Sequence, residues 1–130
     1  MTQSTTVLVI VDPTHPGRPP LTMNQWRNAH HHVQTAAKHR NYTLVRAALG
    51  PSAPRYGRVK VSITQWAPTN RKRDADGLSA FRKDVLDALV HYGVIVDDNS
   101  KYVVDGGNLP KVDKSNPRIE IRIDELEARA

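Results

Sequence analysis

The 130-residue sequence contains no cysteine. The chain therefore has no disulfides, no thiolate metal ligands and no cysteine nucleophile, a composition that fits a reducing compartment. It also lacks an apolar run of about 18 residues, so no transmembrane helix is expected. The N-terminus has neither a basic segment nor a small-residue cleavage site, which argues against secretion and predicts a cytoplasmic protein.

Acidic residues are almost absent from the first part of the chain. Residues 1–73 hold eleven Lys and Arg but a single acid, Asp12, whereas residues 74–130 hold eight Lys and Arg against twelve acids. The formal charges of the two regions are +10 and −4, within a total of +6. A basic region that adjoins an acidic cluster favours a polyanionic partner, with a second kind of site at the boundary.

Hydrophobic patterning predicts one α/β (α+β) domain over residues 1–130, with a mixed sheet of about five strands and two main helices. Strands are predicted at 7–11, 58–66, 94–96, 101–104 and 118–123, and helices at 25–49, with Thr22 or Asn24 as cap, and at 78–92. Hydrophobic residues make up only 38% of the chain, which indicates a thin core that a subunit interface would supplement.

The boundary between the two charge regions carries an acidic motif. A basic run at 71–73 leads directly into Asp74 and Asp76, and Asp97 and Asp98 follow a predicted strand. In an extended segment, side chains two residues apart point to the same side. If the two segments meet, three or four carboxylates converge, and hard oxygen ligands favour Mg²⁺ or Mn²⁺. A divalent ion beside basic side chains suits phosphodiester hydrolysis.

Each of these fragments also has an ordinary structural interpretation. An Asp-x-Asp turn is often a solvated loop, and Asp-Asp after a strand often forms a turn with an Asx hydrogen bond. Lys83 lies seven residues after Asp76, about two helical turns, so the two side chains could share a helix face. The alternative for Lys83 is an exposed ion pair with Asp87 four residues later, and spacing alone favours that pair.

Taken together, these residues resemble the RusA family of Holliday-junction resolvases, the crossover-junction endodeoxyribonucleases. The family pattern is a Pro-Pro loop leading to an Asn, a basic run into Asp-x-Asp-Asn, a Lys, an Asp-Ala-Leu helix, a Gly and an Asp-Asp pair. The corresponding residues are Pro19-Pro20, Asn24, Arg71-Lys72-Arg73, Asp74-Ala75-Asp76-Gly77, Lys83, Asp87-Ala88-Leu89, Gly93 and Asp97-Asp98. The similarity covers roughly residues 8–123 and is specific at 73–98.

The resemblance implies a RusA-like homodimer, bacterial or phage-encoded, that resolves four-way junction DNA in recombination and repair by paired symmetric nicks. The implied cofactor is Mg²⁺, with Mn²⁺ as a substitute. The implied catalytic residues are Asp74, Asp76, Lys83 and Asp98, of which the three aspartates are metal ligands, with Asp97 as a further candidate ligand. We predict DNA contacts from Asn24, Arg27, Arg71, Lys72 and Arg73.

Two features depart from the family pattern. Gly77 stands where the family usually has Asn, so one side-chain amide is missing from the site. Asp76 and Lys83 are seven residues apart, whereas shorter members have a spacing of four. We expect the additional residues to lengthen the loop before the helix, near residues 78–80, rather than the helix itself.

Three consecutive histidines, His30 to His32, and His39 seven residues after His32 raise the question of a zinc site. No acid lies in the predicted helix that carries them, and consecutive helical side chains point in different directions. We therefore expect that the three neighbours cannot bind a single ion. The alternative is a basic helix surface that faces DNA.

Two other functions stay open at this level. One is a non-catalytic junction or nucleic-acid-binding protein with a degenerate metal site, for which Gly77 is the sequence argument. The other is a metal-dependent nuclease that acts on RNA through the same residues. The set Asp74, Asp76, Lys83 and Asp98 is intact, which favours an enzyme because a disabled one would be expected to lose a member.

Overall fold

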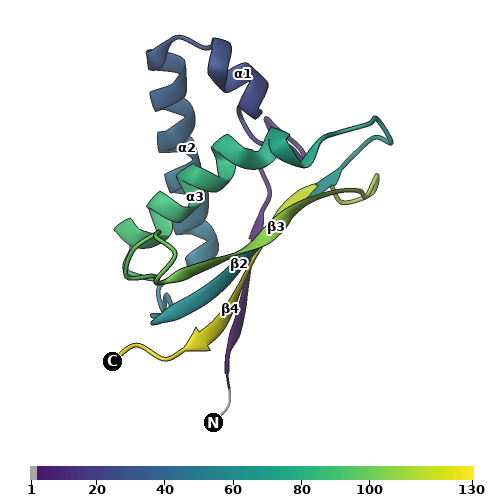
Figure 1. Ribbon diagram of the computed structural model, residues 1–130. Helices are drawn as coiled ribbons and strands as arrows, with labels where there is room; N and C mark the ends of the chain where they lie inside the picture. The colour runs from purple at the N-terminus through teal and green to yellow at the C-terminus, as the bar shows by residue number, and fades with distance from the viewer. Residues whose placement is uncertain (1–2) are drawn as a thin grey trace.

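The computed structural model describes residues 3–130 as a small α+β domain with two main helices on one side of a four-stranded sheet (Figure 1). The elements in chain order are β1 (Thr5–Ile10), α1 (Met23–Asn28), α2 (His31–Leu49), β2 (Arg58–Ala67), the 3-10 helix η1 (Ala75–Leu78), α3 (Ser79–His91), β3 (Val103–Val112) and β4 (Arg118–Glu127). The α+β class, the mixed sheet and the two main helices agree with the sequence prediction.

The strands form one sheet with the spatial order β1-β4-β2-β3. β4 pairs antiparallel with both β1 and β2, whereas β2 and β3 are parallel. A parallel pair needs a crossover connection, and here it consists of η1 and α3. The chain therefore leaves β2 at one end of the pair and enters β3 at the other, so the two segments flanking α3 lie at opposite ends of that helix (Figure 1).

The core lies between the sheet and helices α2 and α3. β2 alternates as a half-buried strand should, with Val59, Val61 and Ile63 fully buried and Lys60 exposed. Side chains from β4 and α3 complete this layer: Ile119, Ile121, Ile123, Phe81, Val85 and Leu89. The four-residue spacing along α3 places its three members on one helix face, which fixes how α3 lies on the sheet.

The predicted strand at 94–96 is wrong, and the sheet has four strands rather than five. The N–H groups of Val94 and Ile95 donate to the Leu89 carbonyl oxygen at 2.9 and 3.4 Å, so they close the end of α3 instead of joining a ladder. Gly93, with φ of 79°, turns the chain at this point. Both side chains are buried, which explains the strand-like apolar pattern.

The single helix predicted over 25–49 is also wrong, because two helices occupy this range. α1 ends at Asn28 and α2 begins at His31, and the intervening Ala29 and His30 have extended backbones. Neither Gly nor Pro marks the break, so the sequence carries no local signal for it.

Across residues 3–130, no helix has both the length and the apolar character needed to cross a membrane.

Candidate active site

Asp74 and Asp76 line an open cleft of 320 Å³ between the proline-rich loop, α1 and the segment that follows β2. Basic and amide side chains form the rest of the wall. The lining residues are Arg18, Pro19, Thr22, Asn24, Gln25, Gln65, Arg71, Arg73, Asp74, Asp76 and Gly77. Of the other residues predicted for the site, Asn24, Arg71 and Arg73 line this cleft, and Arg27 lies beside it through its contact with Asp76.

The acidic wall is a turn in which Asp74 has an extended backbone and Asp76 lies in a 3-10 helix. Asp74 is the N-cap of η1, and the Gly77 N–H donates to its carbonyl oxygen at 3.0 Å. Asp76 lies inside η1 and accepts a hydrogen bond from Ser79 Oγ at 3.2 Å. Leu78 is buried in the core and anchors this turn. Both carboxylates remain exposed, so they are open to a ligand.

The proline-rich loop is fastened to the end of β2. Gln65 Nε2 donates to the Gly17 carbonyl oxygen at 2.8 Å. Gly17 has φ of 63°, and a Cβ there would lie 2.3 Å from the carbonyl oxygen of Trp66, so a side chain is excluded. At the start of the loop, buried Asp12 accepts a hydrogen bond from Arg40 Nε at 2.7 Å. The Arg40 guanidinium holds the pKa of that carboxyl well below its usual range.

Helix α1 delivers two of the predicted DNA-binding residues to the acidic turn. Thr22 caps the helix, and its reciprocal hydrogen bonds with Gln25 form a capping box. Asn24 lines the cleft from the first turn of α1. Arg27 lies 3.7 Å from Asp76, with both side chains about two-thirds exposed, so the pair contributes little to stability. A guanidinium held this loosely is available to a phosphate.

In the basic run at 71–73, Arg73 is hydrogen-bonded to its own loop, whereas Arg71 and Lys72 are exposed. Arg73 donates to the carbonyl oxygens of Thr69 and Arg71 and to Thr69 Oγ, at 2.7 to 2.9 Å, and so holds its own loop in shape. Burial and the charge of Arg71 lower the pKa of Arg73. Arg71 and Lys72 are exposed, and beside them a second cleft continues toward Lys111 on β3.

A model of the family described as endodeoxyribonuclease RusA matches residues 16–124, which is most of the 130-residue chain. The chain belongs to the RusA family. A search of curated proteins gives no match. The family consists of nucleases that act on branched junction DNA, which agrees with a cleft shared by carboxylates and basic side chains.

Lys83, which the RusA pattern implied as catalytic, does not line the cleft of Asp74 and Asp76. Its exposed side chain lines a separate 230 Å³ cleft between the helices, together with Trp26, Lys38, Asp84 and Asp87. The predicted ion pair of Lys83 with Asp87 is absent from residues 3–130 as well, since Asp87 lies 3.5 Å from Lys38 Nζ instead. Burial raises the pKa of Asp84.

Asp97 and Asp98 do not meet the acidic turn within one chain. α3 separates them from Asp74 and Asp76, and its 13 residues span about 20 Å. The Asp97 carboxylate is hydrogen-bonded within its own segment, because the Asp98 N–H and Asn99 Nδ2 donate to it at 2.8 and 3.2 Å. The Asx hydrogen bond of this segment belongs to Asn99, whose Oδ1 accepts from the Lys101 N–H at 2.9 Å. The two acidic segments do not meet within one chain, so the three or four carboxylates do not converge there.

The residues of the cleft fit a hard divalent cation even without a third carboxylate. Mg²⁺ in nucleotide-processing sites is held by one or two carboxylates, with waters and substrate phosphates completing its shell. Asp74 and Asp76 supply exposed carboxylate oxygens in one turn, and Asp76 has a single oxygen engaged by Ser79. Gln65 also shapes the wall of this cleft and was not among the predicted site residues. Its only signal was a polar residue at a buried strand position.

Proposed function

We propose that this RusA-family nuclease is a Mg²⁺-dependent endodeoxyribonuclease that resolves four-way junctions by paired symmetric nicks, in DNA recombination and repair in the bacterial cytoplasm. The observation that carries the proposal is the cleft in which Asp74 and Asp76 face Arg18, Arg71 and Arg73. Two acids that hold a cation, set within a basic wall that holds phosphates, are what metal-assisted cleavage of a polyanion requires.

Each side chain then has a definite task. Asp74 and Asp76 hold the divalent ion, which when bound activates water and stabilises the leaving oxyanion. Arg18, Arg27 and Arg71 bind phosphate oxygens on either side of the scissile bond, and Lys72 extends the contact along the strand. Arg73 keeps this loop in position through its hydrogen bonds to Thr69. Phosphate contacts position the DNA without reading sequence, as a nuclease that recognises junction shape needs.

A homodimer would allow Asp98 of one subunit to join the cleft of the other. Because α3 holds Asp98 far from Asp76 within one chain, Asp98 can join the metal ligands only from a second subunit. In a two-fold dimer such an exchange is reciprocal, so two equivalent sites form together. Paired nicks on opposing strands then follow from the symmetry. Lys83 would contact the substrate from the neighbouring cleft between the helices.

The second candidate function is junction binding without cleavage. It is favoured by Gly77, which leaves the acidic turn without the amide usual in the family, and by the position of Lys83 outside the cleft. In that protein the basic wall would remain functional while Asp74 and Asp76 held no ion. The DNA-binding surface is the same, so only cleavage separates the two functions.

The decisive experiment incubates the purified protein with a synthetic four-way junction, a linear duplex and RNA, each with Mg²⁺ or with EDTA. Symmetric, Mg²⁺-dependent nicks in the junction alone are expected. Tight junction binding without cleavage in Mg²⁺ or Mn²⁺ across the pH range would establish the binding protein instead. Cleavage of RNA in preference to the junction would identify the third candidate.

A further inference from the structure

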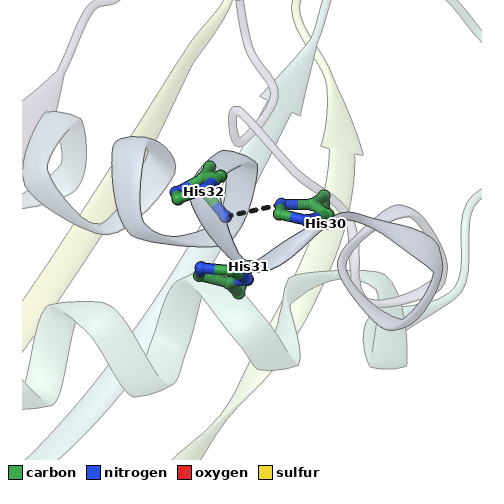
Figure 2. A group of neighbouring side chains, drawn as sticks. All are labelled: His30, His31 and His32. Atoms are coloured by element: carbon green, nitrogen blue, oxygen red, sulfur yellow. Dashed lines mark hydrogen bonds between the residues drawn. The ribbon is translucent and has the colours of Figure 1, made fainter.

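Three histidines lie at the link between α1 and α2, and their imidazole groups differ chemically from the carboxylates of the acidic cleft. His30, His31 and His32 are all exposed, and each offers a ring nitrogen that lies within 4.8 Å of the other two. Figure 2 shows the three rings around the first turn of α2. Ring centroids are 4.1 to 4.7 Å apart. Over residues 3–130 this is the sole group of three or more His, Asp or Glu that converges in this way.

The prediction that three neighbouring histidines must diverge was wrong for a local reason. It assumed that all three lie inside a helix, where successive side chains are about 100° apart. His30 instead precedes α2 with φ of −62° and ψ of 149°, an extended conformation. The change from extended to helical backbone at this residue lets the ring of His30 fold back over the first turn. The helix break therefore creates the cluster.

We propose that His30, His31 and His32 form a binding site for a borderline transition-metal ion of the Zn²⁺, Co²⁺ or Ni²⁺ class. Imidazole nitrogens suit these ions, whereas Mg²⁺ prefers oxygen ligands, so the site is chemically distinct from Asp74 and Asp76. In a tetrahedral site with bonds of about 2.0–2.1 Å, ligand nitrogens lie about 3.3 Å apart. Closing the cluster to that size requires the three exposed side chains to rotate toward one another.

The electrostatic surroundings set the strength of this site. No acid lies in the first turn of α2, and the positive helix end opposes a cation. Three protein ligands leave a coordination position for water, as in open zinc sites. We therefore expect saturable binding of one ion that is weaker than in a buried structural zinc site.

The ion would restrict the short link between α1 and α2, because His30 is one of its two residues. α1 has six residues, none of them buried, and a hydrogen bond from Gln34 Nε2 to the Trp26 carbonyl oxygen at 2.7 Å connects it to α2. A metal that joins His30 to the first turn of α2 would fix the backbone at His30. Because α1 carries Asn24 into the cleft, the restraint would reach the cleft wall through that helix.

His30 allows its two roles to be separated. Its Nδ1 accepts a hydrogen bond from the His32 N–H at 3.3 Å and so caps α2. A metal that binds this nitrogen uses the same lone pair and replaces the cap. His30→Asn retains a good N-cap while it removes a ligand. Any loss of metal binding in this variant is then not a loss of the helix.

The test uses tag-free, full-length protein stripped with a chelator and titrated with Zn²⁺ by calorimetry, and with Co²⁺ by visible absorption, in excess Mg²⁺. One equivalent of each ion is expected to bind. Loss of even an outer partner of a metal ligand costs about 10–100-fold in affinity, so His30→Asn, His31→Gln and His32→Gln combined should weaken binding by at least about 100-fold. His39→Gln, an exposed histidine further along α2, is the matched control and should bind as the wild type does.

Hydrogen exchange measured with and without Zn²⁺ supplies the structural arm. Slower exchange over residues 23–35 is expected in the wild type and in His39→Gln, and no change in the triple variant. Absence of saturable binding in the wild type, or equal affinity in the triple variant, would overturn the site. Binding with unchanged exchange over 23–35 would overturn the restraint on α1. Neither arm depends on DNA cleavage.

Discussion

Two aspartates lie near each end of helix α3, but the two pairs have different surroundings. At the N-terminal end, Asp74 and Asp76 are exposed beside Arg27 and face the basic wall of a cleft. At the C-terminal end, Asp97 is occupied by the backbone and side chain of its own turn, and Asp98 adjoins no comparable cleft among those described. Asp74 and Asp76 share a cleft with basic side chains, whereas Asp97 and Asp98 do not line it. The comparison therefore supports the proposal of a primary site at the first end, which Asp98 would join from a partner subunit.

The parallel pairing of β2 and β3 explains why one chain cannot unite the two ends. Parallel neighbours must be joined by a crossover that returns along the full strand length. The motif spans this crossover: its first acids follow β2, and its last ones precede β3. Residues adjacent in the motif are thus separated in space by the topology itself. A second copy related by a two-fold axis is the simplest way to bring them together.

The largest effect is expected from Asp76→Asn. Loss of a metal ligand removes several kcal/mol of transition-state stabilisation, which corresponds to about 10³-fold in the cleavage rate. Junction binding should be unchanged or tighter, because the substitution removes a negative charge from the DNA-facing cleft. The rate is measured on a labelled four-way junction, and affinity by gel shift in Ca²⁺ or EDTA.

Glu127→Gln serves as the charge-matched control for this variant, since Glu127 is exposed at the end of β4, outside the cleft. Its cleavage rate should equal that of the wild type. Normal cutting by Asp76→Asn would show that the acidic turn is not the site, and the contrast between the two ends of α3 would lose its meaning.

Mixing two inactive variants tests the shared site directly. If Asp76 and Asp98 act in trans, a heterodimer of Asp76→Asn with Asp98→Asn has one doubly damaged site and one intact site. Random exchange of subunits should then restore about a quarter of the wild-type sites. The expected product is a junction nicked on one strand, detected by denaturing gel electrophoresis after co-refolding. Sites contained in one chain would give no recovery, because every site would keep a damaged residue.

A smaller, structural effect is expected midway along α3. Arg82 is buried, donates from Nη2 to the Val61 carbonyl oxygen at 2.8 Å and lies 3.2 Å from Asp105. Arg82→Met keeps the stem but leaves the carbonyl without its donor. We expect a loss of about 1–3 kcal/mol in the free energy of unfolding. Urea denaturation measures it, with exposed Arg55→Met as the control.

An Arg82→Met protein as stable as Arg55→Met would mean that the packing of Phe81, Val85 and Leu89 alone holds α3 against the sheet. The separation of the two acidic ends would then depend on apolar contacts rather than on this buried cation. Either result leaves the chemistry of the cleft unchanged, because Arg82 does not line it.

The sequence was most informative where periodicity and chemistry coincide. Alternation identified β2 and β4, the 3.6-residue spacing identified α3, and the basic run into Asp74 and Asp76 led to residues that line one cleft. These features depend on residues that are neighbours in the chain. Local patterns determine local structure, so such regions are readable without coordinates.

The predictions failed where a hydrogen bond or a strand pairing that the sequence pattern does not encode determines the structure. Val94 and Ile95 look like a strand because they are apolar, yet their N–H groups close α3. The break at Ala29 carries no helix-breaking residue and depends on caps from His30 and Gln34. The distance from Asp76 to Asp98 follows from the parallel pairing, which no local pattern encodes. Local capping decided the first two outcomes and long-range topology decided the third, in each case against propensity.

The smallest effect is expected from Gly77→Asn, which restores the amide usual in the family at the acidic turn. A Cβ at Gly77 would meet no atom within 4 Å, and its φ is not positive, so the substitution fits without strain. Stability should change by less than about 0.5 kcal/mol, as for other surface substitutions. An added side-chain oxygen beside Asp74 and Asp76 should lower the Mg²⁺ concentration for half-maximal cleavage by a few-fold. Gly77→Ala separates the amide from the loss of backbone freedom. An equal response to Asn and Ala would show that the site of this chain works without that group.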